Sequence, residues 1–261
     1  MFRLPMARGY AFFDLDHTLL PFDTQALFCN FVLRREGWRR LYLLLYAICL
    51  PLFLVKILDL RIMKRVFASY LWGMPRERLE EYVSEFLESD FDASLYPEVV
   101  AELERQREEG RLLVLNSASP EFYLEGIAEK LGFDHFLGTD MIVEDRMPLL
   151  PRIEGPNNKK EAKITAMIAR EIIPDLEEEG MEMFLDSWSY SDSSADIPLL
   201  SIAEHGVMIH PGEKLASVGL EKGWRTMTPK RPYDDRRGGH LAALRQILGC
   251  YRLPEGWKTS V

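Results

Sequence analysis

The chain has 261 residues, of which 47% are hydrophobic, which is enough for one large domain or for a domain with an insertion. Its formal net charge is -9 and its isoelectric point is near 5.2, so nucleic acid is an unfavourable partner. The cysteines are too few and too scattered for a disulfide framework or a zinc site: Cys29, Cys49 and Cys250. They indicate a reducing environment. The first residues lack the apolar run of a secretory signal, so we expect a cytoplasmic protein.

A short apolar strand is expected over residues 9–14, and two acids stand at its end. Asp14 and Asp16 follow the stretch Ala11-Phe12-Phe13 with one apolar residue between them. Burying a carboxylate alone is costly unless a cation or hydrogen-bond donors neutralise it. A partner of positive charge is therefore expected beside this strand end.

Residues 22–90 show a helical pattern. Apolar residues recur at helical spacing in QALFCNFVLRR, IMKRVFASYLW and ERLEEYVSEFLES. This run separates the first strand from the rest of the chain. We therefore predict an inserted all-helical cap domain at residues 21–91, with residues 1–20 and 92–261 forming the core domain.

Residues 41–55 form an uncharged and very apolar stretch within this helical region. The stretch is shorter than the roughly 20 residues needed to span a bilayer, and Pro51 interrupts it. Basic residues flank it, with RREGWRR before it and Lys56 after it. Three interpretations remain open: a buried helix of the cap, a helix that touches the inner face of a membrane peripherally, or a true membrane span.

Helices and strands alternate from residue 97 onward. Helices are expected over residues 97–109, 120–133, 159–173 and 196–205, and strands over 111–119, 135–143, within 181–192 and over 206–211. This order predicts an α/β protein with a Rossmann-like, doubly wound and mainly parallel sheet. The polar tail at residues 229–240 is expected to be a solvated loop.

Polar residues follow the strands at several places that the fold would bring to one edge. These places are residues 14–18, 116–119, 159–163 and 191–196. The carboxyl ends of parallel strands meet at one edge of the sheet, where ligands bind. Clustered carboxylates repel one another, and a hard cation such as Mg²⁺ would relieve the repulsion. Together with a lysine, hydroxyl groups and free N–H groups, the pattern indicates phosphoryl-transfer chemistry.

The motifs DLDHT, LNSAS, a downstream lysine and SDSSAD resemble those of the haloacid dehalogenase-like hydrolase superfamily, in its phosphoserine-phosphatase-like branch. The resemblance covers roughly residues 9–226 and implies a phosphatase with a helical cap. It implies that Asp14 is the nucleophile that forms an aspartyl-phosphate and binds Mg²⁺. Asp16 would be the general acid and base and would touch the metal through its main-chain carbonyl. Asp192 would be the second carboxylate on the metal.

The same resemblance implies the remaining roles. Ser117 would bind the phosphoryl oxygens, and Thr18 and Asp196 would support the site. The phosphate-binding lysine is Lys159, Lys160 or Lys163, and Lys163 is preferred because it precedes an apolar helical run eight residues after a glycine. Asp186 competes with Asp192, because it also follows an apolar stretch. Asp186 lacks the second acid that Asp196 provides four residues after Asp192.

The second acid, Asp16, favours phosphomonoester chemistry, because an alkoxide leaving group needs a proton. The substrate is expected to be a small phosphorylated metabolite or a lipid phosphate. The cap stretch 41–55 resembles that of phosphatidylglycerophosphate phosphatases in the same branch, whereas Arg61 and Arg65 are possible arginines for a polar head group. A non-catalytic regulatory or membrane-binding module is the alternative of a different class. The sequence does not separate a hydrolase from a phosphotransferase and gives no oligomeric state.

Overall fold

The structure is a computed structural model that describes residues 9–155, 158–254 and 256–257. Residues 1–8, with which the predicted core domain starts, lie outside the described residues. The expectation that the chain starts without a secretory signal concerns these residues. Positions 156–157 also lie outside the described residues. The predictions for the other elements can be compared with the structure directly.

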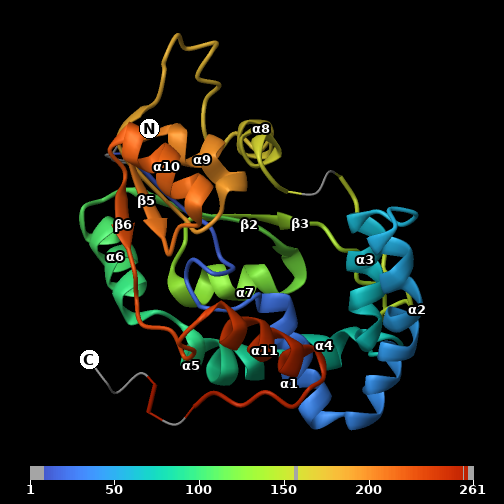
Figure 1. Cartoon of the computed structure of the whole chain (residues 1–261). Helices are drawn as coiled ribbons and strands as arrows, with labels where there is room; N and C mark the ends of the chain where they lie inside the picture. Colours follow the sequence, from blue (N-terminus) through green and yellow to red (C-terminus); the bar gives the residue numbers. More distant parts are fainter. Residues whose placement is uncertain (1–8, 156–157, 255, 258–261) are drawn as a thin grey trace.

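A six-stranded sheet forms the centre of the molecule (Figure 1). Its strands are β1 (Tyr10–Phe13), β2 (Leu112–Pro120), β3 (His135–Thr139), β4 (Phe184–Ser191), β5 (Ala203–Ile209) and β6 (Arg225–Met227). The strand order is β3-β2-β1-β4-β5-β6, and every neighbouring pair is parallel. The predicted α/β class and parallel sheet are confirmed, with β1 at an interior position.

Alternation along the strands divides the core between the two faces of the sheet. Phe13 and Leu115 belong to one hydrophobic cluster, whereas Phe12 and Val114 belong to a second cluster on the opposite face. Phe13 also stacks on Tyr190 of β4, with ring centroids 4.2 Å apart. Because both faces are buried, β1 is apolar throughout, as a strand covered on both sides requires.

Helices cover both faces of the sheet, as expected for a doubly wound fold. Figure 1 shows α6 (Pro97–Glu108) and α7 (Glu121–Leu131) on one side, and α8 (Glu161–Ala169), α9 (Ile197–Ser201) and α10 (Glu213–Lys222) on the other. Helix α7 ends at Gly132, which adopts a left-handed φ of 66° that favours glycine. These connections hold the carboxyl ends of β1, β2 and β4 at one edge.

The predicted cap region is helical. It contains α1 (Thr24–Arg35), α2 (Tyr42–Leu54), α3 (Leu60–Phe67), α4 (Arg76–Phe86) and a π-helical turn at Leu87–Phe91. The short α5 (Asp92–Ser94) follows the region. Buried side chains of α1 and α4 belong to the same cluster as one face of the sheet, and Phe28 lies 5.1 Å from Phe86 between ring centroids. The hairpin of α2 and α3 projects to the side (Figure 1). The domain boundary at residues 21–91 remains a prediction.

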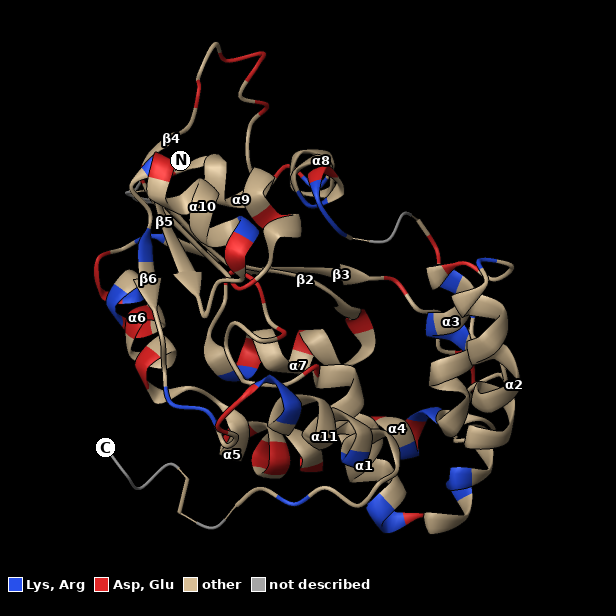
Figure 2. Cartoon of the chain, in the orientation of Figure 1, with Lys and Arg blue, Asp and Glu red and all other residues tan. Residues whose placement is uncertain are grey.

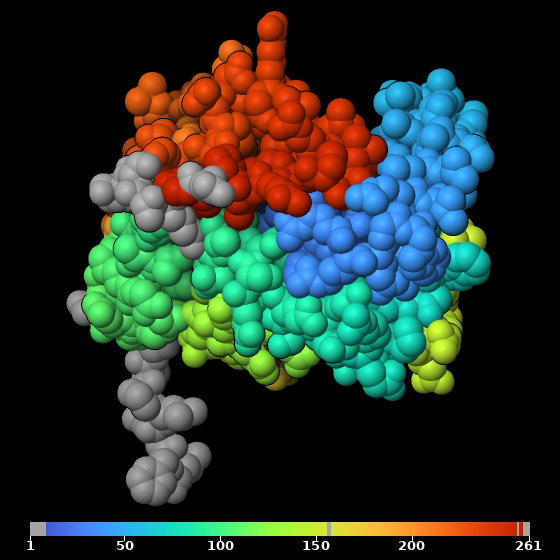
Figure 3. Space-filling view, turned by 90° about the horizontal axis from the view of Figure 1, so that it is seen from below, coloured from blue at the N-terminus to red at the C-terminus, as the bar shows by residue number. Residues whose placement is uncertain are grey.

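Helix α2 is exposed, so its interpretation as a buried helix is wrong. Tyr42 is the one residue of α2 that is buried, whereas Leu44 is 67% exposed, Ile48 66% and Leu54 70%. The helix packs mainly against α3, and Tyr42 at its start donates to the carbonyl of Ile247 in α11 (Arg236–Ile247) at 2.7 Å. Figure 3 shows this segment in light blue at one edge. The segment Gly37–Leu54 has 18 residues and a mean hydropathy of 1.3, so it is long and apolar enough to cross a membrane by length and composition alone.

Several boundaries differ from the sequence prediction, and the helix expected over 159–173 is α8, which ends at Ala169. The strand expected over 135–143 ends at Thr139, and the helix expected over 196–205 ends at Ser201. Ala203 is already in β5, because it pairs with Phe184 of β4. The tail expected to be a loop instead leads into α11 (Arg236–Ile247), whose first turn is capped by the Asp235 carboxylate through the N–H of Gly238 at 2.7 Å. Helix α11 packs against α1.

Candidate active site

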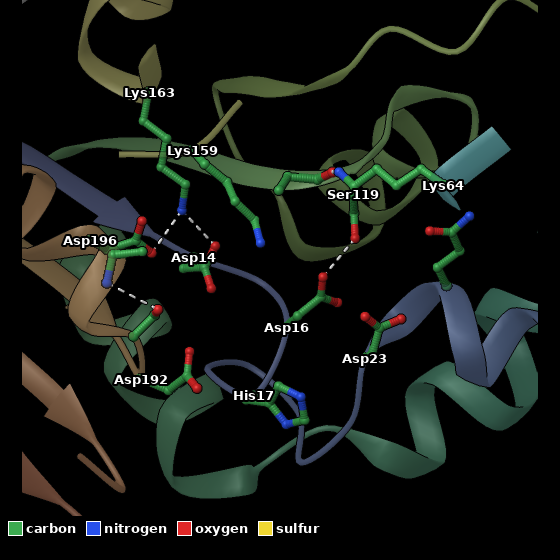
Figure 4. A pocket seen from close by; sticks show the side chains of 14 residues that line it. Asp14, Asp16, His17, Asp23, Lys64, Ser119, Lys159, Lys163, Asp192 and Asp196 are labelled. Atoms are coloured by element: carbon green, nitrogen blue, oxygen red, sulfur yellow. Dashed lines mark hydrogen bonds and ion pairs between the residues drawn. The ribbon is translucent and has the colours of Figure 1, made fainter. Parts of the chain in front are cut away.

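A polar pocket of about 220 Å³ lies where β1, β2 and β4 end (Figure 4). Five carboxylates line it: Asp14, Asp16, Asp23, Asp192 and Asp196. Three lysines face them: Lys64, Lys159 and Lys163. The structure thus gathers around one pocket the acids and the lysine that the sequence places on separate segments, as parallel topology requires.

Asp14 lies directly beyond β1 and is buried. Its main-chain N–H donates to the carbonyl of Tyr190 at 3.0 Å, which fixes the residue against β4. Its Oδ1 accepts from Lys163 Nζ at 2.7 Å, and its Oδ2 lies 3.5 Å from the hydroxyl of Thr18. Burial raises the pKa of Asp14 to about 8, against the opposing charge of Lys163, and the neighbouring carboxylates raise it further. The charge of Lys163 thus opposes the effect of burial on Asp14 without cancelling it.

Lys163, in the first turn of α8, joins two carboxylates. Its ammonium donates to Asp14 at 2.7 Å and to Asp196 Oδ2 at 2.8 Å, and the side chain is 2% exposed. Burial opposes its charge, but the two carboxylates outweigh burial and raise the pKa of Lys163. Of the three lysines that the sequence left open, Lys163 makes these contacts and Lys159 also lines the pocket, whereas Lys160 does not line it.

Asp16 links the end of β2 to the start of the cap. One carboxylate oxygen accepts from the N–H of Thr24 at 2.7 Å, and the other accepts from the hydroxyl of Ser119 at 2.8 Å. The intervening turn is tight, and His17 adopts a φ of 59° in the left-handed region. These contacts hold the Asp16 carboxylate at the pocket wall, close to Asp14.

Asp192 follows β4, and its main-chain N–H donates to the Thr18 hydroxyl at 3.1 Å. Burial raises the pKa of Asp192 to about 6. Its carboxylate lines the pocket and makes no hydrogen bond or salt bridge with the described residues. The competing Asp186 adopts a positive φ near the start of β4, pairs with Arg111 and does not line the pocket.

Ser117 and Ser119 are placed differently from what the motif suggested. Ser117 is fully buried, and its hydroxyl accepts from the N–H of Ser119 at 3.0 Å. It does not line the pocket, whereas Ser119 does. The ladder between β2 and β3 shifts register between Asn116 and Pro120, so simple alternation does not tell which serine faces the site. The sequence did contain a sign of this role, because Ser119 is the second serine of the motif LNSAS, two residues after Ser117.

The cap supplies lining residues that sequence reasoning missed. Lys64 of α3 reaches the carbonyl of Ala118 at 2.9 Å, and burial lowers the pKa of Lys64 to about 8. Asp23 and Gln25, at the start of α1, also line the pocket. Helical periodicity marked this lysine as part of a helix and gave no sign that it faces the core domain.

Arg61 and Arg65, which the sequence suggested for a substrate head group, do not line the pocket. Arg61 donates to the carbonyl of Ile153, and Arg65 Nε donates to the carbonyl of Pro151 at 2.9 Å. Both arginines therefore attach α3 to the connection between β3 and α8. The structure gives them a role in positioning the cap.

The oxygen ligands of the pocket fit Mg²⁺ by their chemistry. No group of three His, Cys, Asp or Glu side chains has the arrangement of a metal centre among the residues that the structure covers. However, five carboxylates against three lysines leave two uncompensated negative charges if all are ionised. The carboxylates of Asp14 and Asp192 and the carbonyl of Asp16 offer oxygens only, which a hard cation prefers.

Comparison with known proteins agrees with this geometry. The family of haloacid dehalogenase-like hydrolases matches residues 11–201. The inhibition of morphological differentiation protein of Streptomyces azureus is 29% identical over 87% of this chain and 80% of its own length. A probable phosphatase of Mycobacterium tuberculosis is 27% identical over 87% of this chain and 78% of its own length.

Solved structures share the fold. A protein of unknown function from Bordetella pertussis Tohama I superposes with a TM-score of 0.65 and 25% identity, over 84% of this chain and 97% of that one. A phosphoserine phosphatase in its apo form gives a TM-score of 0.54 with 18% identity, over 94% of this chain and 99% of that one. The chain belongs to the haloacid dehalogenase-like hydrolase family, and it is a hydrolase with the fold of the phosphoserine-phosphatase branch.

Proposed function

We propose that the chain is a Mg²⁺-dependent phosphatase that hydrolyses phosphomonoesters through an aspartyl-phosphate on Asp14. The phosphatase class follows from the family and from the relative of that name. The observation that carries the mechanism is the buried contact of Lys163 with both Asp14 and Asp196, beside Asp16 and Asp192. A nucleophilic carboxylate, a second acid and a cation then lie in one pocket.

The reaction has two steps. The Asp14 carboxylate attacks phosphorus, and the bond from phosphorus to the leaving oxygen breaks while Asp16 gives that oxygen a proton. Water then attacks phosphorus, Asp16 takes the proton from the water, and the aspartyl-phosphate bond breaks to release phosphate and Asp14. Ser119, which donates to Asp16, would orient this carboxylate in both steps.

The other residues bind and position. Lys163 would hold Asp14 and neutralise phosphoryl charge. Ser117, which the family resemblance implied as a phosphoryl ligand, does not line the pocket and would instead position the N–H of Ser119, which donates to its hydroxyl. Thr18 would support the site because its hydroxyl contacts both Asp14 and the N–H of Asp192. Asp196 would support it by fixing Lys163.

The carboxylates of Asp14 and Asp192 and the main-chain carbonyl of Asp16 would hold the Mg²⁺ ion. When bound, the ion supplies positive charge for the phosphoryl oxygens and relieves the repulsion among the carboxylates. The cap at residues 21–91 would add Lys64 and Gln25 to the substrate side of the pocket. The expected substrate is a small phosphorylated metabolite or a lipid phosphate, met in the cytoplasm or at the inner face of a membrane.

Removal of Mg²⁺ with EDTA is expected to abolish turnover of an aryl phosphate, and added Mg²⁺ to restore it. Asp192→Asn should raise the half-saturating Mg²⁺ concentration by about tenfold to a hundredfold, because one metal ligand is lost. The measurement is initial rate against Mg²⁺ concentration. The matched control is Asp186→Asn, which lies away from the pocket and pairs with Arg111. An EDTA-treated enzyme that keeps its rate, or equal shifts in the two variants, would contradict the proposal.

We also propose peripheral membrane contact through α2. Figure 2 shows α2 without charged residues, and basic residues lie before and after it. Trp38, just before the helix, is 56% exposed, and Lys56 follows the helix. An exposed apolar helix with an exposed tryptophan and flanking basic residues is typical of a segment that lies in the headgroup region.

The triple variant Leu44→Gln, Ile48→Gln and Leu54→Gln is expected to lower partition onto anionic phospholipid vesicles by at least about tenfold, because apolar surface is lost. Cosedimentation measures the bound fraction. The control is Leu220→Gln in α10, because Leu220 is 85% exposed and lies outside α2. This variant should leave vesicle binding unchanged. No binding by the unmodified protein, or equal binding by the triple variant, would exclude membrane contact through α2.

A further inference from the structure

A second cavity, an apolar groove of about 380 Å³, lies beside the candidate active site. Leu50 and Phe53 of α2 line it, Leu60 and Phe67 of α3 line it as well, and Ile247 of α11 also contributes. An aromatic cluster stiffens the wall, because Phe67 packs against Tyr46 at 6.0 Å and against Tyr70 at 5.8 Å between ring centroids. The groove is therefore built by packed helices and does not depend on a loop.

The groove and the active-site pocket share four lining residues, namely Asp23, Gln25, Lys64 and Lys159. The two cavities are therefore adjacent and meet at these side chains. Figure 4 shows Asp23, Lys64 and Lys159 on the active-site side of this junction. One end carries the carboxylates and lysines, and the other is walled by aliphatic and aromatic side chains. A single ligand that spans both ends needs a phosphate group at one end and an apolar chain at the other.

The lysines at the junction suit such a ligand. Lys64 comes from α3 and reaches Ala118 at 2.9 Å, so its aliphatic stem borders the groove while its ammonium lies on the pocket side. This is the usual arrangement of a lysine between apolar and charged surroundings. A fully polar substrate would leave Leu50, Phe53 and Phe67 facing water, whereas an alkyl chain would displace that water favourably.

We propose that this groove binds the apolar chain of an amphiphilic phosphomonoester whose phosphate lies at Asp14. The proposal rests on the phosphatase function proposed above and names the substrate class of the same site. Such a molecule could reach the groove free in solution or from a lipid bilayer. The apolar outer face of α2 adjoins the groove residues Leu50 and Phe53 on the same helix, so both sources are tested below.

The test is the dependence of kcat/KM on chain length for monoalkyl phosphates of two to ten carbons, used below their micelle concentrations. The unmodified enzyme should gain about twofold to fourfold per methylene until the groove is filled. Leu50→Gln and Phe53→Gln should flatten this slope and leave ethyl phosphate turnover unchanged. Ala243→Trp, on α11 and also lining the groove, should shorten the longest accepted chain.

The matched control is Leu54→Gln, on the same helix but outside the groove, which should keep the full slope. Hydrolysis of every chain length at one rate, or equal flattening by Leu54→Gln, would overturn the groove proposal while leaving the phosphatase intact. No hydrolysis of any member, ethyl phosphate and aryl phosphate included, would instead overturn the proposed function. Faster turnover of decyl phosphate in phosphatidylcholine vesicles than as monomer would identify the bilayer as the source, and equal turnover would identify free substrate.

Discussion

Asp14→Asn is expected to lower kcat for phosphomonoester hydrolysis by about 10⁴-fold or more, the loss typical of removing a nucleophile. The amide has nearly the shape of the carboxylate, but its oxygen cannot form the aspartyl-phosphate. The ammonium of Lys163 could still donate to the amide oxygen of the introduced asparagine, and it would keep its contact with the carboxylate of Asp196. Steady-state rates with p-nitrophenyl phosphate and saturating Mg²⁺ measure the effect.

The fold of this variant can be checked separately. We expect its free energy of unfolding to stay within about 1 kcal/mol of the unmodified protein, because the weaker contact with Lys163 is offset by less repulsion among the acids. The repulsion among these acids contributes to the raised pKa of Asp14. Burial is the main cause of the raised pKa, and the charges of Asp196 and Asp192 raise it further. A variant that folds normally and keeps more than a tenth of the rate would show that the nucleophile is elsewhere.

Lys163→Met is expected to lower the free energy of unfolding by about 3–5 kcal/mol, the cost of leaving buried charge without its partner. Lys163 is 2% exposed and holds Asp14 and Asp196 at 2.7 and 2.8 Å. Methionine fills the same space but has no charge and no donor. Urea unfolding without Mg²⁺ measures the loss, since a bound cation would compensate for part of it.

Two further variants make this test specific. Lys159→Met, at an exposed lysine that also lines the pocket, should change stability by less than about 0.5 kcal/mol. The double variant Lys163→Met with Asp196→Asn should recover part of the loss, because one unpaired carboxylate is removed. A decrease below about 1 kcal/mol for Lys163→Met would contradict a role of this ion pair in stabilising the folded site.

The fold was predictable because its main signals are local. The apolar runs of β1, β2, β4 and β5 and the helical periodicity between them fix the order of elements, and the parallel topology follows from that order. Boundaries that depend on strand pairing were not predictable. The sequence pattern places Ala203 in a helix, and only its pairing with Phe184 of β4 shows that it belongs to β5. Likewise, α11 begins inside a polar tail because Asp235 caps it.

The candidate site was predictable to the extent that strand ends determine it. Asp14, Asp16 and Asp192 follow β1 and β4 directly, so the sheet alone brings them together. The register shift near the end of β2 lies beyond such reasoning, and it exposes Ser119 to the pocket in place of Ser117. Lys64 was missed because its position depends on how α3 packs against the core domain.

The apolar stretch 41–55 shows a different limit. An uncharged helix has the same sequence pattern whether other helices surround it or a membrane does, because both environments favour apolar side chains. Its exposure follows from the position of the α2–α3 hairpin at the edge of the molecule, which is a property of the whole fold (Figure 3). The groove between α2, α3 and α11 has the same origin, since its walls come from segments almost 200 residues apart.

Transfer of the phosphoryl group to one particular carboxylate is the step on which the mechanism depends. The most direct measurement mixes the enzyme and Mg²⁺ with a substrate carrying radiolabelled phosphate, stops the reaction with acid within milliseconds, and maps the label on the protein. The mechanism predicts a hydroxylamine-labile label on the peptide that contains Asp14, and no label on the Asp14→Asn variant. Rapid turnover during which the protein acquires no label, or a label on another residue, would contradict the mechanism.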